Sequence, residues 1–206
     1  TIDTVSMMYF MNYAIGIIGA LLSKFGLPDT SPDFSLNGSL LYNTFTFISV
    51  VVLAPIFEEL IFRGMILQTL SKYNKMFAIV VTSLLFGLLH LNMTQAIPAF
   101  FMSLILCYMC LKTDSLLVTI LAHAGNNFLA LMSAYSNNIM ITILVLSLVI
   151  YGLITVVLKS KEINEFIKEE KTNDNWYARF FKRIPNILYL IFTILWIVIS
   201  LFMNMF

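Results

Sequence analysis

The sequence predicts an all-α, polytopic membrane protein: a transmembrane helical bundle of about seven membrane helices. Of its 206 residues, 60% are apolar and only 11% are charged, and the mean hydropathy is +0.91. Soluble domains average about 45 to 50% apolar and about 25% charged residues. The apolar residues also gather in long charge-free runs, and about 20 such residues let one helix cross a bilayer. Lipid is therefore the expected solvent for most of the chain.

Seven charge-free runs predict the membrane helices. They cover about residues 7–22, 40–57, 76–91, 96–111, 116–134, 139–158 and 187–206. The third and fourth are short for a span. No basic region precedes the first run, so no signal peptide is expected, and the natural chain can extend further upstream. Without an internal repeat, low-complexity tract or soluble second domain, residues 1–206 are expected to form a single integral membrane domain.

The sixth connection, at about residues 159–185, is strongly charged. Its apolar residues fall on helical spacings among Lys, Arg and Glu, which is typical of an amphipathic segment at the cytoplasmic membrane interface. A solvated linker between two spans would show the same composition. Neither alternative implies chemistry.

Basic residues predict how the chain is oriented in the cell membrane. The odd-numbered loops hold only Lys24, whereas the second, fourth and sixth loops hold Lys72, Lys75, Lys112, Lys159, Lys161, Lys168, Lys171, Arg179, Lys182 and Arg183. Lys and Arg concentrate on cytoplasmic loops, so the loops after the second, fourth and sixth helices are expected to be cytoplasmic. This clustering at span ends, with a net charge of +1, gives no argument for a nucleic-acid partner.

The two cysteines, Cys107 and Cys110, have the C-x-x-C spacing of redox and zinc sites. They lie within an apolar run, with neither a second pair for zinc nor the strand-to-helix context of a redox motif. We interpret them as inert packing residues.

Ionisable residues interrupt the apolar runs at one depth. Glu58, Glu59 and Arg63 continue the second run, and roughly 20 Å of helix separates Glu58 from the nearest lysine. His90 and His123, the only two histidines, lie roughly 16 to 20 Å along their own runs. A charge at such depth costs at least about 2.5 to 3.5 kcal/mol, so these residues are functional candidates.

Helical spacing predicts how these side chains are grouped. Glu59 and Arg63 are four residues apart with the acid first, the favourable order for a structural ion pair. Glu58 points about 100° away and is left as the free carboxylate. His123 and Asn127 are also four residues apart, so both face one groove. Their side chains can therefore donate hydrogen bonds to the same oxygen atom.

A carboxylate beside a histidine in a poorly solvated pocket is a usable base for water. Imidazole and amide N–H donors can stabilise the oxyanion that forms when water attacks a carbonyl. Each residue alone also fits a structural role, as a buried salt bridge or an interhelical hydrogen bond. The coincidence of both histidines with the only deep carboxylates favours a functional site.

Three motifs in this order resemble the CAAX protease and bacteriocin-processing family, also called the abortive-infection family. Its signature is Glu-Glu-x-x-x-Arg, then Phe-x-x-x-His, then His-x-x-x-Asn, on separate membrane helices. Residues 58–63, 86–90 and 123–127 match the three motifs without a departure. The match covers about a third of the chain.

The resemblance implies an intramembrane endopeptidase that hydrolyses a membrane-associated peptide or protein near its terminus. By the resemblance, Glu58, assisted by His90, activates water, while His123 and Asn127 hold the oxyanion. Three further residues are implied to support the site: Glu59, Arg63 and Phe86.

The same resemblance implies the partners. Family members include eukaryotic enzymes that trim prenylated CAAX proteins and bacterial ones linked to peptide maturation or bacteriocin immunity. Nothing in this sequence selects among those substrates. The expected partners are membrane lipid and a peptide or lipidated protein substrate, with the oligomeric state open.

Two alternatives stay open. No cofactor is expected, but Glu58, His90 and His123 also form a valid zinc set with an open position for water. The metal-free mechanism is favoured because the chain lacks His-Glu-x-x-His and because three ligands from three helices need accurate preorganisation. The other alternative is a non-catalytic membrane scaffold or bacteriocin-immunity protein that binds a partner, although a scaffold need not keep costly polar groups in lipid. A transporter would show an inverted repeat, and none is evident.

Overall fold

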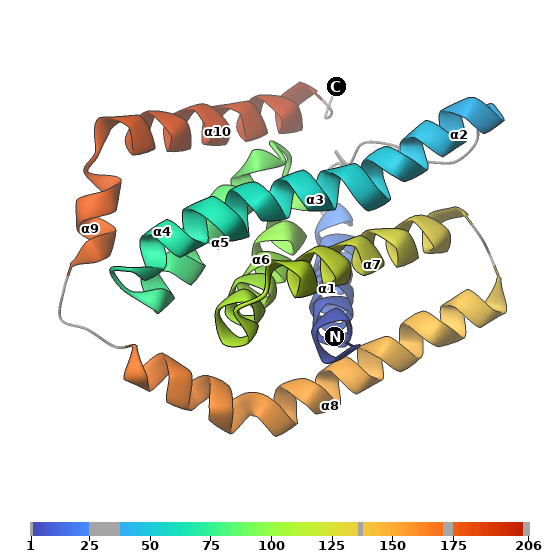
Figure 1. Cartoon of the computed structure of the whole chain (residues 1–206). Helices are drawn as coiled ribbons and strands as arrows, with labels where there is room; N and C mark the ends of the chain where they lie inside the picture. The colour runs from blue at the N-terminus through green and yellow to red at the C-terminus, as the bar shows by residue number, and fades with distance from the viewer. Residues whose placement is uncertain (1, 25–37, 136–137, 171–174, 204–206) are drawn as a thin grey trace.

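The computed structural model describes residues 2–24, 38–135, 138–170 and 175–203, and within these ranges it contains helices and no strand (Figure 1). The predicted all-α bundle is therefore confirmed. Joining contiguous segments gives eight helices in the described part of the chain. Each of the seven predicted runs coincides with one of them, apart from residues 204–206, which lie outside the described residues. The eighth is a short helix, α9, in the charged segment.

The second helix is one continuous rod over Leu40–Ser71 that changes geometry along its length. It consists of α2 (Leu40–Phe47), the π-helical stretch η1 (Ile48–Leu53), α3 (Ala54–Glu59), the π-helical stretch η2 (Leu60–Leu67) and α4 (Gln68–Ser71). The other helices are α1 (Ile2–Ser23), α5 (Lys75–Leu89), α6 (Met93–Thr113), α7 (Leu116–Tyr135), α8 (Ile139–Glu169), α9 (Trp176–Phe181) and α10 (Ile184–Met203).

Four helices of the described chain are long and apolar enough to cross a membrane: the rod, α6, α7 and α8. The chain is thus a multi-pass membrane protein. Two more apolar helices, α5 and α10, are shorter. The fourth run is short, but its helix is longer: α6 follows an Asn92 cap and continues through Lys112, reaching 21 residues. A single charge near a helix end does not stop the helix.

The charged segment at 159–185 is divided in the structure. Its first part continues α8 as far as Glu169, in a helix of 31 residues. Residues 171–174, including Lys171, lie outside the described residues. The short helix α9 then packs its aromatic face on the α4–α5 corner, where the Trp176 ring lies 5.1 Å from Tyr73. Whether this segment lies at the membrane interface stays a prediction.

Close helix crossings depend on two glycines. A Cβ on Gly152 of α8 would lie 2.0 Å from the backbone oxygen of Ser6 in α1, so these helices touch backbone to backbone. In the α5–α6 hairpin, a Cβ on Gly87 would lie 2.7 Å from the carbonyl oxygen of Ala96. Larger residues would push both pairs apart.

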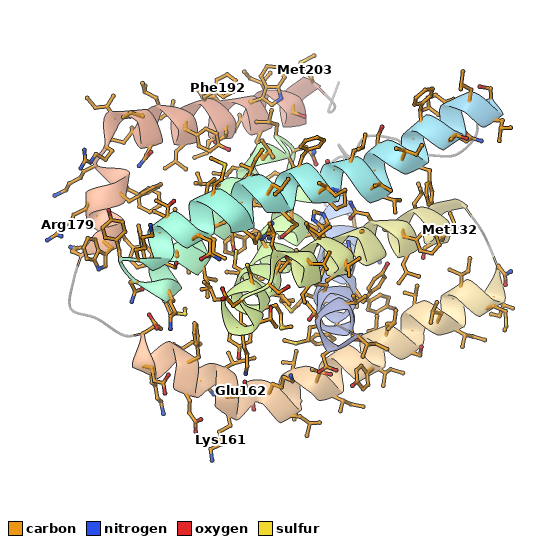
Figure 2. All side chains as sticks on the ribbon, in the orientation of Figure 1. Met132, Lys161, Glu162, Arg179, Phe192 and Met203 are labelled. Atoms are coloured by element: carbon orange, nitrogen blue, oxygen red, sulfur yellow. The ribbon has the colours of Figure 1, made fainter. Side chains whose placement is uncertain are left out.

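Polarity is inverted relative to a soluble protein. The outer face of α7 exposes Leu117 and Leu121, each 63% accessible, while Glu59 and Arg63 on the rod are fully buried. Figure 2 shows side chains radiating outward from all the helices. With lipid as solvent, apolar side chains are expected outside and the few charged ones inside.

Candidate active site

The acidic residues lie where the rod departs from α-helical geometry. Glu58 and Glu59 end α3, between the two π-helical stretches. Pro55, at the start of α3, has no N–H and cannot make the ordinary bond four residues back, which accounts for the changed register. Such π-helical interruptions are frequent at functional sites.

Glu59 and Arg63 form the ion pair expected from their spacing. Glu59 Oε1 lies 2.9 Å from Arg63 Nη1, and both side chains are 0% exposed. The guanidinium also donates from Nη2 to Ser103 Oγ on α6 at 2.8 Å. Its carbon lies 4.6 Å from the centre of the Phe86 ring on α5. One buried cation therefore ties the rod to the α5–α6 hairpin.

His123 of α7 lies between the two glutamates. Its Nδ1 is 2.9 Å from Glu59 Oε1, and its Nε2 is 3.8 Å from Glu58 Oε2. The Glu58 side chain is 26% exposed, whereas that of Glu59 is fully buried. The sequence assigned Glu59 to Arg63 alone and paired Glu58 with His90. A ring with nitrogens on opposite edges can reach both carboxylates, although ideal helical geometry turns them about 100° apart.

The contacts of His123 determine where its proton lies. An ionised carboxylate can only accept a hydrogen bond, so Nδ1–H donates to Glu59. Nε2 is then the ring atom directed toward Glu58. Their 3.8 Å separation is too long for a direct hydrogen bond, so the two groups face each other closely without one.

His90 lies just past the end of α5, as its C-cap residue. Its Nδ1 is 3.1 Å from the Phe86 carbonyl oxygen, an obligate acceptor, so Nδ1–H donates and Nε2 is left as an acceptor. Among the described residues, no hydrogen bond or ion pair joins His90 to Glu58. The Phe86 ring instead contacts both histidines edge to face, at 5.3 Å from His90 and 5.9 Å from His123.

Asn127 lies one turn beyond His123 on α7. Its Nδ2 donates to the backbone oxygen of Val50 at 3.0 Å, and its Oδ1 accepts from Asn126 Nδ2 at 3.3 Å. Sequence reasoning missed Asn126, which is buried and hydrogen-bonded to α1. The available signal was its polarity: an amide within an apolar membrane run needs a partner.

No three His, Cys, Asp or Glu side chains in the described part of the chain are grouped closely enough to hold a metal ion. The metal-free mechanism and the zinc set of Glu58, His90 and His123 both stay predictions. Cys107 and Cys110 are free and buried, and Cys107 Sγ lies 3.8 Å from Ser83 Oγ.

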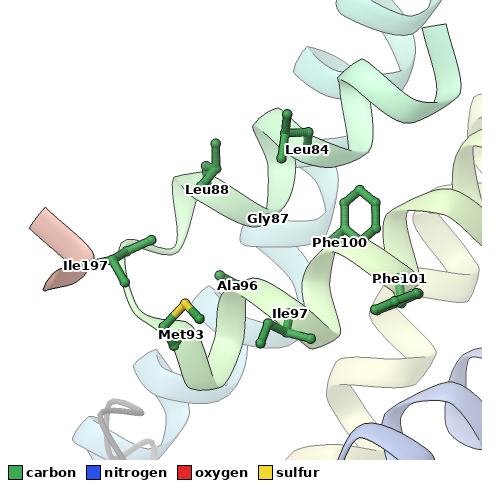
Figure 3. Close-up of a pocket in the computed structure, with 9 residues that line it drawn as sticks. All are labelled: Leu84, Gly87, Leu88, Met93, Ala96, Ile97, Phe100, Phe101 and Ile197. Carbon is green, nitrogen blue, oxygen red and sulfur yellow. The ribbon is translucent and has the colours of Figure 1, made fainter. Parts of the chain in front are cut away.

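An apolar cavity of about 230 Å³ lies between α5, α6 and α10 (Figure 3). Figure 3 shows Leu84 and Leu88 on one helix, Phe100 on the next and Ile197 from α10. None of its lining residues is titratable, so it carries no acid–base chemistry of its own.

Comparison with known proteins identifies the central part of the chain. Residues 40–129 match the family described as Rce1-like, type II CAAX prenyl endopeptidase. This confirms the resemblance drawn from the three motifs, and all seven predicted site residues lie inside the match. Helices α1, α8, α9 and α10 lie outside it. No curated protein and no solved structure matches this chain.

Proposed function

We propose that this multi-pass membrane protein is an intramembrane endopeptidase that hydrolyses a membrane-associated peptide or protein near its terminus. One observation carries the proposal: His123 is held between a buried, charge-paired glutamate and a partly exposed one, within the segment that matches the endopeptidase family. Two carboxylates in such different environments can perform different tasks.

Glu59 and Glu58 have different roles in the proposed reaction. Glu59 is neutralised by Arg63 and holds the His123 ring, so it acts as a support. Glu58 lacks that cation and is reachable from outside, so it meets water and substrate. It takes one proton as water oxygen bonds to the scissile carbonyl carbon, and it returns that proton to the leaving amine when the C–N bond breaks.

The oxyanion receives its hydrogen bonds from α7. The Nδ1–H bond to Glu59 fixes the His123 ring, so a proton carried on Nε2, the ring atom that faces Glu58, would be directed toward the developing charge. Asn127 adds the N–H that Val50 does not use. Donors already held in place before the reaction stabilise the tetrahedral state most strongly.

His90 is proposed as a second acceptor for the attacking water. Its Nδ1–H is occupied by the Phe86 carbonyl, which leaves Nε2 with a lone pair. Phe86 contacts both histidines, so its ring sets their spacing.

The proposed location is the cell membrane, with the second, fourth and sixth loops cytoplasmic. Ion pairs support a common side for these loops: Lys75 meets Glu170, and Lys112 meets Glu162. They bring the start of α5 and the end of α6 to the charged end of α8. The proposed partners are membrane lipid and a peptide or lipidated protein substrate.

The test compares peptides released from membranes that carry the wild type or Glu58→Gln at matched abundance, by mass spectrometry. Prenylated and unmodified peptides are both supplied. Glu162→Gln, an exposed carboxylate outside the matched segment, is the control. We expect a product with wild type and the control and none with Glu58→Gln, because an amide cannot take the proton from water. Identical profiles from folded proteins would favour a partner-binding scaffold instead.

A chelation arm separates the two mechanisms. The metal-free reaction is expected to continue after dialysis against a zinc chelator. Activity lost on chelation and restored by Zn²⁺ alone would replace it with the zinc alternative, in which the metal lowers the pKa of its bound water.

A further inference from the structure

The side-chain amide of Asn127 is restrained at both ends. Its Nδ2 faces the Val50 carbonyl oxygen at 3.0 Å, and its Oδ1 faces Asn126 Nδ2 at 3.3 Å. A backbone carbonyl can only accept, so the group facing Val50 must be the NH₂ group. With the NH₂ group fixed at Val50, the oxygen Oδ1 is the end that faces Asn126, whose Nδ2 donates to it. The Val50 carbonyl therefore assigns the orientation of an amide whose ends are otherwise hard to distinguish, and the Asn126 contact is consistent with it.

The Val50 carbonyl is available to Asn127 because of Pro55. In η1 the Ala54 N–H bonds five residues back, to Ser49 O. The next donor in that register, for Val50 O, is residue 55, and proline has no N–H. The ordinary α-helical partner of Val50 is Ala54, which is already bonded to Ser49. An unpaired backbone oxygen inside a membrane protein needs another donor, and Asn127 supplies it.

The other end of the amide is held through α1. Asn12 Nδ2 donates to Asn126 Oδ1 at 3.2 Å, and the Tyr9 hydroxyl donates to the Asn126 backbone oxygen at 3.1 Å. Tyr9 and Asn126 are each only 7% exposed. Asn126 therefore cannot rotate without breaking buried hydrogen bonds, which is costly in a low-dielectric interior. Helix α1 lies outside the segment that matches the family.

We propose that Pro55 and Asn12 are positioning residues that act on Asn127 from opposite sides, Pro55 through the Val50 carbonyl and Asn12 through Asn126. Together they keep one N–H of Asn127 directed away from protein acceptors, as a donor ready for substrate. This inference rests on the proposed function for its catalytic consequence. The orientation of the amide does not depend on it.

The first test measures the orientation without substrate. Protein labelled with ¹⁵N-asparagine is placed in lipid nanodiscs, and Asn127→Leu identifies the side-chain NH₂ signal of Asn127 by its loss. Pro55→Ala restores an N–H that competes for Val50 O. We expect the Asn127 signal to move toward that of a free amide, because the restored N–H takes the Val50 oxygen that now accepts from Asn127.

Pro98→Ala is the matched control, since Pro98 is also inside a membrane helix but in α6. It should leave the Asn127 signal in place. An unmoved signal in Pro55→Ala, or equal shifts in both variants, would overturn the role of Pro55.

A second variant tests the α1 side. Asn12→Leu removes the donor to Asn126, and Tyr13→Phe, an exposed position on the same helix, is its control. We expect the Asn127 signal to shift in Asn12→Leu only. An unchanged Asn127 signal in Asn12→Leu would rule out the positioning role of Asn12, independently of the result for Pro55→Ala.

The activity arm separates this inference from the proposed function. With any peptide found to be cleaved, Pro55→Ala and Asn12→Leu should each lower kcat about tenfold with little change in KM, because the loss is in the transition state. Glu58→Gln should abolish cleavage without moving the Asn127 signal. If no peptide is cleaved by any variant, the proposed function fails, while the nuclear magnetic resonance shifts still decide the positioning of Asn127.

Discussion

Two sets of ion pairs in this molecule each join a basic residue to a glutamate, but they differ in burial and in consequence. Glu59 and Arg63 pair at 0% exposure and share further polar partners on α6 and α7. At the charged end of α8, the side chains of Lys112 and Glu162 also form an ion pair but are 46% and 42% exposed. Breaking a buried pair leaves a charge without water, whereas a broken surface pair is resolvated. The comparison shows that the burial of an ion pair, more than its presence, determines how much stability is lost when the pair is broken.

The two sets also differ in what they connect. The buried pair organises the candidate active site, because Arg63 reaches Ser103 and Phe86 while Glu59 reaches His123. The exposed pair of Lys112 and Glu162 lines a charged cleft of about 310 Å³ between α8 and the ends of α5 and α6. Figure 2 shows Glu162 on the side of α8 that faces the bundle, with Lys161 pointing away from it. This pair joins α8 to α6 without contacting the candidate active site.

The largest expected effect comes from Arg63→Met, which removes the buried cation and leaves Glu59 ionised and uncompensated. We expect a loss of about 3 to 5 kcal/mol in the free energy of unfolding, measured by denaturant titration in micelles. The double variant Glu59→Gln, Arg63→Met removes both charges and should recover most of that stability. If the double variant is as unstable as the single one, packing rather than charge explains the loss.

An intermediate effect is expected from Ser103→Ala. Arg63 Nη2 would lose its 2.8 Å hydrogen bond to Ser103 Oγ and keep only the Ser103 backbone oxygen at 3.5 Å. A buried donor left poorly paired costs about 1 to 3 kcal/mol. Ser133→Ala on the exposed part of α7 is the control and should change stability little. Equal losses of stability in the two variants would contradict a specific contribution of the Arg63–Ser103 hydrogen bond.

The smallest effect is expected from Glu162→Gln. Exposed ion pairs contribute about 0 to 1 kcal/mol, so unfolding should shift by no more than that. The difference should also disappear in high salt, which screens exposed charges. A loss similar to that of Arg63→Met would show that burial does not separate the two sets.

Much of the fold could be predicted because the bilayer imposes simple requirements. Charge-free runs predicted the seven apolar helices in the described part of the chain, since backbone groups in lipid must be satisfied within a helix. The α6 helix was longer than its apolar run, because hydropathy marks the part in lipid rather than the last helical residue. The spacing of Glu59 and Arg63 predicted their pair for an equally local reason.

Contacts between helices could not be predicted in the same way. The sequence paired Glu58 with His90, whereas the structure places Glu58 nearest to His123 and turns His90 toward the Phe86 carbonyl. Two π-helical stretches flank Glu58 and Glu59 and change the direction in which nearby side chains point. Ideal helical angles cannot anticipate that rotation.

The sequence by itself determined that this is a helical membrane protein and which polar residues lie deep within it, because both follow from composition and local spacing. Only the tertiary structure decided that His123 joins both glutamates and that α1, through Asn126, reaches Asn127. Tyr9 and Asn126 are 117 residues apart in the chain, and such contacts depend on how whole helices rotate and cross. Helix packing sets that rotation, and no local pattern in the sequence encodes it.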